Sequence, residues 1–317
     1  MNEKVVILDG GFATELEAGG FKIQGDPLWS ARLIHTNPQA IKDVHCRFLS
    51  SGADVICTAT YQASVEGFMK FLGLSSEQAV QLLMSGVYLA KEAAQEFHQT
   101  CRDPERKMPL VAASVGPYGA FLHDGSEYTG AYEETMHIQD FKAWHRQQIQ
   151  CLVSAGVDLI AMETIPSQKE AEALVDLLRE FPNSKAWLSY SCKDEQCISH
   201  GEKFAEAVKV ASRSDQLVAI GLNCCPPTMV SPLLASANKN KAPGLSWVVY
   251  PNSGGEWDHS TGWIMQKTKS SLADFSLEWE ELGAKWIGGC CGTTPSDIAE
   301  LKHRLHDHSN SKEDPAV

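Results

Sequence analysis

Eight short apolar segments recur along this chain, and a helical pattern separates each from the next. Several are nearly continuous runs of apolar and β-branched residues, as is typical of parallel strands covered on both faces. The eight expected strands cover residues 5–9, 53–60, 110–116, 157–164, 186–191, 217–224, 245–251 and 285–290. A chain built this way must bury both faces of its sheet.

The helical patterns between these segments fix how the strands are connected. They cover residues 38–51, 75–99, 138–155, 167–181, 203–212, 228–237, 272–282 and 296–305. Three of them end at Gly52, Gly156 and Gly283 just before a strand, which is typical of a helix C-terminus. Eight strand–helix alternations predict an α/β fold of one domain, a closed (β/α)8 TIM barrel. The alternative, an open doubly wound sheet, is less favoured because no G-x-G-x-x-G follows the first strand.

Composition limits the partners and the location of such a barrel. The chain has 317 residues and a formal net charge of −13, which argues against nucleic acid as a partner. There is no apolar run of about 20 residues and no charged-then-apolar leader, so we expect a soluble cytoplasmic protein. The ten cysteines are expected to be thiols in that compartment. We expect the barrel to span residues 1–305 and the polar segment 306–317 to be a disordered tail.

Cysteines follow two of the expected strands. One group is Gly288-Gly289-Cys290-Cys291-Gly292, and the other is Gly221-Leu222-Asn223-Cys224. Neighbouring side chains of a regular strand point to opposite faces, but the flanking glycines allow both sulfurs to turn toward one point. Functional groups of a TIM barrel collect at the C-terminal strand ends, and strands six and eight flank strand seven. The three sulfurs are therefore predicted to meet at one rim, where thiolates favour zinc.

The remaining cysteines are interpreted as small packing residues, because free cysteine is often buried. They are Cys46, Cys57, Cys101, Cys151, Cys192, Cys197 and Cys225. Cys225 competes with Cys224 for the ligand role, since alternation along a strand lets only one of them face inward.

Two carboxylates also lie at expected strand ends. Asp9 precedes two glycines, so it is either a turn residue or a site residue. Glu163 ends an apolar run, where an unpaired carboxylate is costly and a cation such as a substrate ammonium would resolve the cost. The histidines are weaker candidates. Only His123 and His259, both in loops, are expected near the mouth of the barrel.

The motifs Asp9-Gly10-Gly11, Gly221-Leu222-Asn223-Cys224 and Gly288-Gly289-Cys290-Cys291-Gly292, in this order, resemble the homocysteine S-methyltransferase family over about residues 4–305. Within that family the chain looks most similar to methyltransferases that use S-methylmethionine or S-adenosylmethionine. The segments that point there are 13–17, 28–31, 60–63, 114–120, 124–128 and 249–254. Betaine-using relatives carry tyrosine where this chain has Gln62, and no folate or cobalamin module is found.

The resemblance implies a site and a reaction. Zinc would be bound by Cys224, Cys290 and Cys291, with the homocysteine sulfur as fourth ligand, and a sulfonium methyl group would pass to that sulfur and give methionine. The implied substrate-binding residues are Asp9 and Glu163 for the ammonium and the Gly10-Gly11-Phe12 backbone for the carboxylate. Asn223 and Gln62 are further candidates for substrate binding, and Asn223, beside a ligand, would either hold the loop or hydrogen-bond a sulfur. Trp29, Tyr61, Tyr118 and Tyr250 would either face the sulfonium through cation–π contacts or only pack.

Several alternatives remain open at this stage. A related enzyme could use betaine as donor, or selenocysteine or selenohomocysteine as acceptor. A barrel of another class could be a metal-free hydrolase or lyase working through Glu163 and Asp9. A zinc-stabilised binding barrel would need a fourth protein ligand, for which His259 is a candidate. The sequence alone also leaves the preferred donor and the oligomeric state undecided.

Overall fold

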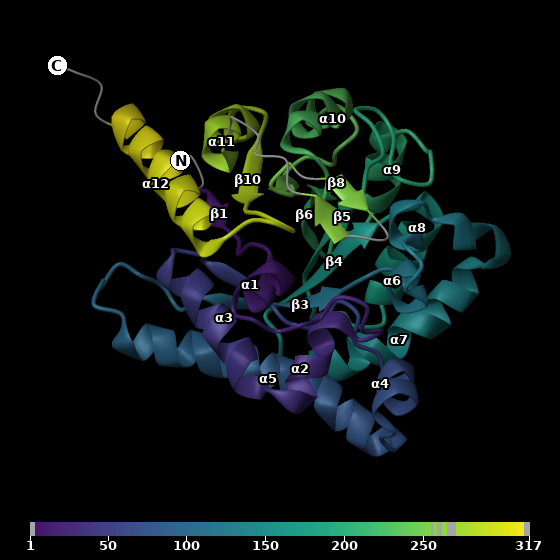
Figure 1. The fold of residues 1–317 in the computed structure, drawn as a ribbon. Helices are drawn as coiled ribbons and strands as arrows, with labels where there is room; N and C mark the ends of the chain where they lie inside the picture. Colours follow the sequence, from purple (N-terminus) through teal and green to yellow (C-terminus); the bar gives the residue numbers. More distant parts are fainter. Residues whose placement is uncertain (1–3, 255, 259–261, 265–270, 314–317) are drawn as a thin grey trace.

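Eight parallel strands form one sheet in the order β1-β10-β7-β6-β5-β4-β3-β2 (Figure 1). The structure is a computed structural model that describes residues 4–254, 256–258, 262–264 and 271–313. The strands are β1 (Val6–Ile7), β2 (Val55–Cys57), β3 (Leu110–Val115), β4 (Leu159–Ile165), β5 (Ala186–Tyr190), β6 (Leu217–Asn223), β7 (Ser246–Tyr250) and β10 (Ala284–Ile287). Each lies within or next to one of the eight expected segments.

The two ends of this sheet meet and close the barrel. Leu8, next to β1, bridges Val55 of β2 in parallel, and the Asp54 N–H donates to the Ile7 carbonyl at 2.7 Å. Strand β7 pairs with β6 on one side and with β10 on the other. The predicted TIM-barrel fold is confirmed, and it brings the ends of β6 and β10 to the same part of the rim.

Helices follow the strands and form the outer layer (Figure 1). The long ones are α3 (Pro38–Ser50), α5 (Ser76–Thr100), α7 (Ile138–Ser154), α8 (Gln168–Leu178), α9 (Phe204–Ala211), α10 (Val230–Ala237), α11 (Leu272–Glu281) and α12 (Pro295–Glu313). Local signals set their starts. Asn37 caps α3 through Ala40 N, and Ser75 and Gln78 form a capping box on α5. Within the described residues, no helix has both the length and the apolar character to cross a bilayer.

Two apolar layers hold the barrel together. The large layer lies between sheet and helices, and a smaller one fills the barrel interior with side chains such as Leu8, Val55, Ala112 and Ala219. Trp187 of β5 occupies much of that interior space and packs edge-on against Tyr250 at 6.3 Å between ring centroids. The barrel is therefore a packed core, and space for a ligand is left at its mouth.

The segments between strand ends and long helices hold structure that the sequence analysis did not predict. They form α1 (Phe12–Ala18), η1 (Trp29–Ala31), α2 (Arg32–Thr36), α4 (Val65–Leu72), α6 (Tyr118–Leu122), η2 (Ser126–Tyr128), η3 (Ala131–Thr135), η4 (Pro227–Met229) and the hairpin of β8 (Glu256–Asp258) and β9 (Gly262–Ile264). The last helix, α12, continues to Glu313, past the boundary expected at residue 305. Residues 314–317 of the expected tail lie outside the described part of the chain.

Candidate active site

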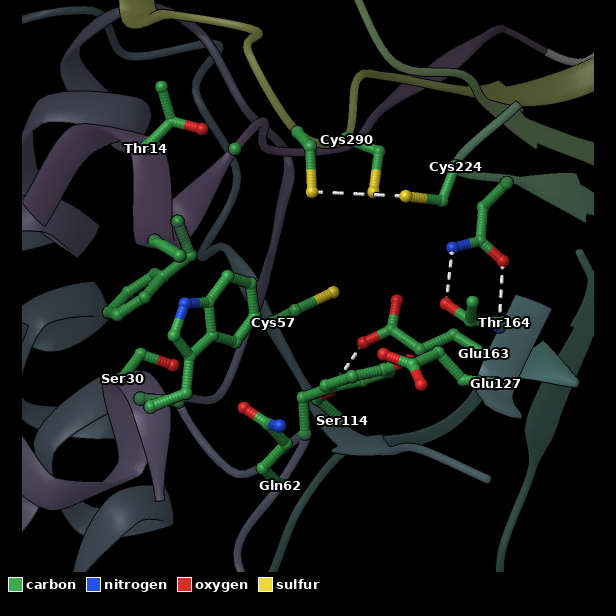
Figure 2. A pocket seen from close by; sticks show the side chains of 18 of the residues that line it. Thr14, Ser30, Cys57, Gln62, Ser114, Glu127, Glu163, Thr164, Cys224 and Cys290 are labelled. Atoms are coloured by element: carbon green, nitrogen blue, oxygen red, sulfur yellow. Dashed lines mark hydrogen bonds between the residues drawn. The ribbon is translucent and has the colours of Figure 1, made fainter. Parts of the chain in front are cut away.

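A cavity of about 970 Å³ opens at the C-terminal ends of the strands (Figure 2). The wall is built from residues at or just after the C-terminal ends of β1, β2, β3, β4, β6, β7 and β10, together with two loops around residues 24–30 and 123–128. All the residues predicted as site residues line it: Asp9, Gly10, Gly11, Gln62, Glu163, Asn223, Cys224, Cys290 and Cys291. The topology thus gathers groups that lie far apart in the sequence.

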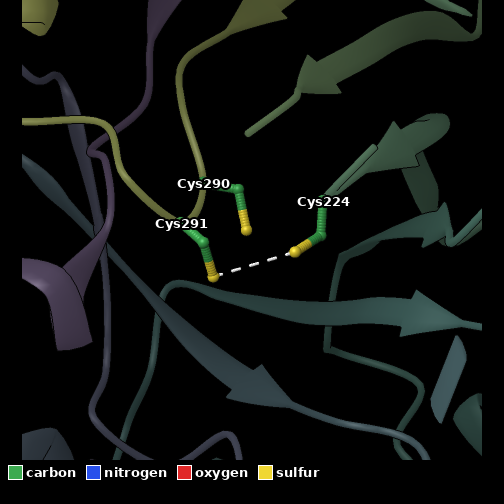
Figure 3. A group of neighbouring side chains, drawn as sticks. All are labelled: Cys224, Cys290 and Cys291. Atoms are coloured by element: carbon green, nitrogen blue, oxygen red, sulfur yellow. Dashed lines mark hydrogen bonds between the residues drawn. The ribbon is translucent and has the colours of Figure 1, made fainter. Parts of the chain in front are cut away.

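Three sulfurs converge at one side of this cavity (Figure 3). The Sγ atoms of Cys224, Cys290 and Cys291 all lie within 4.8 Å of one another, and Cys224 Sγ is 3.8 Å from Cys291 Sγ. In the part of the chain that the structure describes, no fourth His, Cys, Asp or Glu joins them. The candidate fourth ligand His259 lies outside the described residues. This convergence is the geometry that the strand order predicts.

The three thiols share their protons unequally. Hydrogen bonds from Cys290 and Cys291 lower the pKa of Cys224 well below its usual range. The same contacts raise the pKa of Cys290, with burial adding to the effect. The Tyr128 hydroxyl lies 3.4 Å from Cys224 Sγ, which favours the thiolate further. The three thiols are therefore an interacting group in which the pKa of Cys224 is lowered and that of Cys290 is raised.

The glycines before the cysteine pair act through close packing. A Cβ on Gly289 would lie 2.2 Å from Thr293 Cγ2, and one on Gly288 would lie 2.6 Å from Leu8 Cβ. A positive φ, 77°, is found only after the pair, at Gly292, whose N–H donates to Thr14 Oγ1 at 2.9 Å. We expected the glycines to allow a backbone conformation that a strand does not have. At Gly288 and Gly289 the missing side chain instead leaves room for Leu8 and Thr293, which pack against the backbone.

Two strand ends beside the sulfurs have an unusual backbone. Thr164 has a φ of 61° and Cys224 a φ of 53°, in a left-handed region that is costly, above all for a β-branched residue. The Asn223 Oδ1 accepts from Thr164 N and from Ser189 Oγ, both at 2.8 Å, and its Nδ2 donates to Thr164 Oγ1 at 2.8 Å. The Asn223 amide thus holds the ends of β4 and β6 together, as expected for a residue that supports the loop beside a ligand, and its role as a substrate-binding residue stays a prediction.

The two predicted carboxylates, Asp9 and Glu163, are buried in the cavity wall, and Figure 2 shows Glu163 there. Asp9 Oδ2 accepts from Cys57 N at 2.7 Å, and burial raises the pKa of Asp9 to about 8, with Glu163 adding to the shift. Glu163 accepts from the Ser114 hydroxyl, and burial raises its pKa to about 7. Among the described residues that line the cavity there is no Lys or Arg. These carboxyls are therefore suited to a cation supplied by a ligand.

The other predicted contacts are only partly available. The Gly11 N–H already donates to Thr293 O at 2.9 Å, so a carboxylate held at this loop would use the amides of Gly10 and Phe12. Gln62 Nε2 donates to Ala120 O at 3.2 Å, while its Oε1 is buried and has no hydrogen-bond partner among the described residues. Gln62 thus presents an unused acceptor.

Three of the four predicted aromatic residues line the cavity, namely Trp29, Tyr61 and Tyr250. The Tyr250 hydroxyl is 2.5 Å from Ser189 Oγ and accepts from Trp187 Nε1 at 3.0 Å, and a hydrogen bond between Tyr250 and Glu163 counteracts the rise in the pKa of Glu163, so its polar end links the barrel interior to the cavity wall. Tyr118 does not reach the cavity. It packs edge-on against Trp144 at 5.1 Å, and its prediction as a mouth residue is wrong.

Other cavity residues were not predicted as site residues. Cys57, interpreted as a packing residue, lines the wall beside Asp9. Glu127 and Tyr128 also line the cavity, from a loop after β3, and the expected loop residue His123 lies there too. We predicted site residues only at the C-terminal ends of expected strands. Glu127 and Tyr128 lie in η2 and not directly after a strand, so they were not predicted. The motif Asp124-Gly125-Ser126-Glu127-Tyr128 could have indicated them, but we used it only for the family resemblance and assigned its residues no role in the site.

Comparison with known proteins places this geometry among methyltransferases. The family model for homocysteine S-methyltransferase matches residues 6–305. The betaine-homocysteine S-methyltransferase of Drosophila melanogaster is 41% identical over 310 residues, which cover 94% of this chain and 93% of that protein. Homocysteine S-methyltransferase 1 of Zea mays is 42% identical over 306 residues, which cover 94% of each. The metallated form of the homocysteine methyltransferase MmuM from Escherichia coli matches with a TM-score of 0.84 and 38% identity, covering 96% of this chain and 97% of MmuM.

Proposed function

This chain belongs to the homocysteine S-methyltransferase family and is a methyltransferase enzyme, and we propose that it transfers the methyl group of a sulfonium donor to homocysteine beside a zinc ion. The donor would be S-methylmethionine or S-adenosylmethionine, and the product methionine. One observation carries the proposal. Three sulfurs from β6 and β10 meet in the wall of a cavity whose described lining has carboxylates but neither Lys nor Arg.

The residues present fit zinc. Cys224, Cys290 and Cys291 offer three soft ligand atoms within 4.8 Å of one another, and all three line the cavity. The lowered pKa of Cys224 makes a thiolate available to bind a metal. When bound there, zinc would favour the deprotonated form of a substrate thiol, which is otherwise mostly protonated at neutral pH. The cluster faces the cavity, which leaves one side of it accessible to that thiol.

Asp9 and Glu163 would hold the ammonium group of homocysteine. They come from β1 and β4, they interact electrostatically, and both are buried without a cationic partner in the cavity lining. Placing one ammonium between them offsets the cost of their burial. The amides of Gly10 and Phe12, beside Asp9, are the groups left at this loop for the substrate carboxylate. Held at this end, the substrate can extend its thiol toward the sulfur cluster.

Methyl transfer in this site needs no general base at the moment of reaction. The homocysteine thiolate sulfur attacks the methyl carbon and forms a new C–S bond, while the donor S–CH₃ bond breaks and its electron pair stays on the donor sulfur. A sulfonium thereby becomes a neutral thioether, and the attacking thiolate becomes a second thioether. The protein therefore contributes alignment of the two sulfurs and an anionic wall that attracts the cationic donor.

Betaine is the alternative donor, since one relative with 41% identity is a betaine-homocysteine S-methyltransferase. An anionic cavity attracts a quaternary ammonium as well as a sulfonium. Gln62 favours the sulfonium, since the resemblance drawn from the sequence implies tyrosine here in betaine-using relatives, and this chain has a glutamine with a buried, unused Oε1 in the cavity lining.

A direct assay tests the proposal. Purified protein loaded with zinc is incubated with homocysteine and with S-methylmethionine, S-adenosylmethionine or betaine, and methionine is measured together with the zinc content. We expect methionine with at least one sulfonium and about one zinc per chain. Methionine formed from betaine alone would contradict the proposal that the donor is a sulfonium. Full activity in protein free of zinc would contradict the proposal that zinc takes part.

A further inference from the structure

Glu127 is a third carboxylate in the cavity, and the reaction proposed above gives it no task. It lies in η2, on a loop after β3, and its side chain enters the same cavity as Asp9 and Glu163 (Figure 2). The hydroxyl of the next residue, Tyr128, is 3.4 Å from Cys224 Sγ, so the loop brings Glu127 close to the sulfur cluster. The Ser191 hydroxyl donates to the Glu127 carbonyl at 3.0 Å and fixes the backbone there.

The charge of Glu127 is not matched by the protein around it. Its Oε2 atom is buried and has no hydrogen-bond partner among the described residues. Burial raises the pKa of Glu127 to about 7, and the Cys224 thiolate adds to the shift. Two other acids of the lining do have partners: Asp26 pairs with Arg32, and Asp124 accepts from Ser126 N at 2.9 Å. Glu127 is therefore an unused acceptor for a positively charged hydrogen-bond donor.

Homocysteine does not supply that donor. It has one ammonium group, and Asp9 and Glu163 already form one shared site for it on β1 and β4. S-methylmethionine and S-adenosylmethionine each bring a second α-ammonium with three N–H groups, whereas betaine is a quaternary ammonium without any N–H. We propose that Glu127 binds the α-ammonium of an amino-acid sulfonium donor and so selects such donors over betaine. This inference rests on the proposed function and extends it to the donor.

The test compares two donors in two enzymes. One donor is S-methylmethionine, and the other is 4-(dimethylsulfonio)butanoate, the same molecule without its amino group. The variant is Glu127→Gln, and the matched control is Glu134→Gln, an exposed carboxylate in η3 outside the cavity lining. The KM of each donor and of homocysteine is measured at about pH 8, above the pKa of about 7 of Glu127.

Glu127→Gln is expected to raise the KM of S-methylmethionine by about 10- to 100-fold, the usual effect of losing a hydrogen bond to a charged group. The KM of homocysteine and that of the deaminated donor should change by less than about twofold, as in Glu134→Gln, because neither contacts Glu127. Equal losses with both donors, or no change with S-methylmethionine, would overturn the inference. If the glutamine variant does not fold, Glu127→Ala, which also removes the carboxylate, provides the same comparison, and Glu127→Asp, which keeps the charge, should lose less affinity for S-methylmethionine than either.

The wild-type protein separates the two proposals. If it transfers no methyl group from either sulfonium, the proposed function fails. If it does so and Glu127→Gln behaves like wild type, only the role of Glu127 fails.

Discussion

Among the residues that the structure describes, two groups of side chains satisfy the simplest geometric requirement for a metal site, and they differ in what else their members do. The ligand atoms of Cys224, Cys290 and Cys291 lie within 4.8 Å of one another, and so do those of Glu133, His200 and Glu202. In the second group Glu133 pairs with Lys169 at 3.4 Å, Glu202 accepts from Gln168 N at 3.1 Å, and His200 Nδ1 is 3.1 Å from Glu202.

The difference lies in charge balance and position. The acidic group already has a cation, Lys169, and Glu133 and Glu202 line a separate outer hollow of about 540 Å³. The sulfurs line the main cavity, where no described residue supplies a positive charge. Proximity of ligand atoms alone therefore does not identify a metal centre. A cluster that still lacks positive charge is the better candidate.

The largest effect that separates the two groups is loss of a sulfur. Cys290→Ser should remove most of the bound zinc and lower methyl transfer by more than about 100-fold, beyond the effect usual for groups that merely support a ligand. His200→Ala should keep the zinc content and change the activity by less than about twofold. Metal analysis and the methionine assay on both variants make the comparison. Zinc retained in Cys290→Ser, or lost in His200→Ala, would contradict the assignment of the metal site to the cysteine cluster.

Two buried carboxylates provide a second contrast. Glu163→Gln should raise the KM of homocysteine by about 10- to 100-fold, because a charged hydrogen bond to the substrate ammonium is lost. Glu133→Gln should leave this KM unchanged and lower the thermal midpoint slightly, since Lys169 loses its carboxylate partner but keeps its hydrogen bonds to the Glu133 and Met136 carbonyls. Steady-state kinetics and thermal melts check both variants. An unchanged KM in Glu163→Gln would remove this residue from the substrate site.

The strand ends beside the sulfurs allow a finer test. Asn223→Ala leaves Thr164 N without its acceptor and Ser189 Oγ without one of its partners, and it removes the contact that holds two left-handed backbone positions. We expect a loss of about 1–3 kcal/mol in the free energy of unfolding and about 10- to 100-fold weaker zinc binding. Denaturant titration and metal competition measure the two quantities. Full zinc affinity in a destabilised variant would show that Asn223 serves the fold and not the site.

The same carboxylates predict a dependence on pH. Burial raises the pKa of Asp9 to about 8 and of Glu163 to about 7, and both must ionise to bind an ammonium. The KM of homocysteine should therefore fall as the pH rises from about 6 to about 8, by up to about 100-fold per unit below both pKa values and by about tenfold per unit between them.

The free energy of unfolding should change with pH in the unfavourable direction, although substrate binding improves. These pKa values lie above the ordinary 3.8 and 4.5, so ionisation lowers the free energy of unfolding of the substrate-free protein from about pH 4 to about pH 8. Measuring KM and stability against pH in wild type and Glu163→Gln isolates the contribution of Glu163. Identical profiles in the two proteins would contradict it.

The sequence was sufficient to predict the repeated strand–helix units of the barrel. Apolar runs and glycine-ended helices predicted the barrel, and the barrel's strand order predicted that Cys224 meets Cys290 and Cys291. The loops were not predictable in this way. Glu127 acquires its burial from how η2 folds over the cavity, and Asn223 acquires its role from the backbone at Thr164, on another strand. Such contacts depend on tertiary packing, which a pattern along one segment does not contain.

An acidic cavity also treats a methyl donor and its product differently. A sulfonium amino acid carries one more positive charge than the thioether that it becomes, so the attraction between cavity and ligand weakens once the methyl group has moved. The product keeps its ammonium group but has lost the sulfonium charge, so it is held less tightly than the donor. Added salt should accordingly weaken donor binding more than it weakens inhibition by methionine.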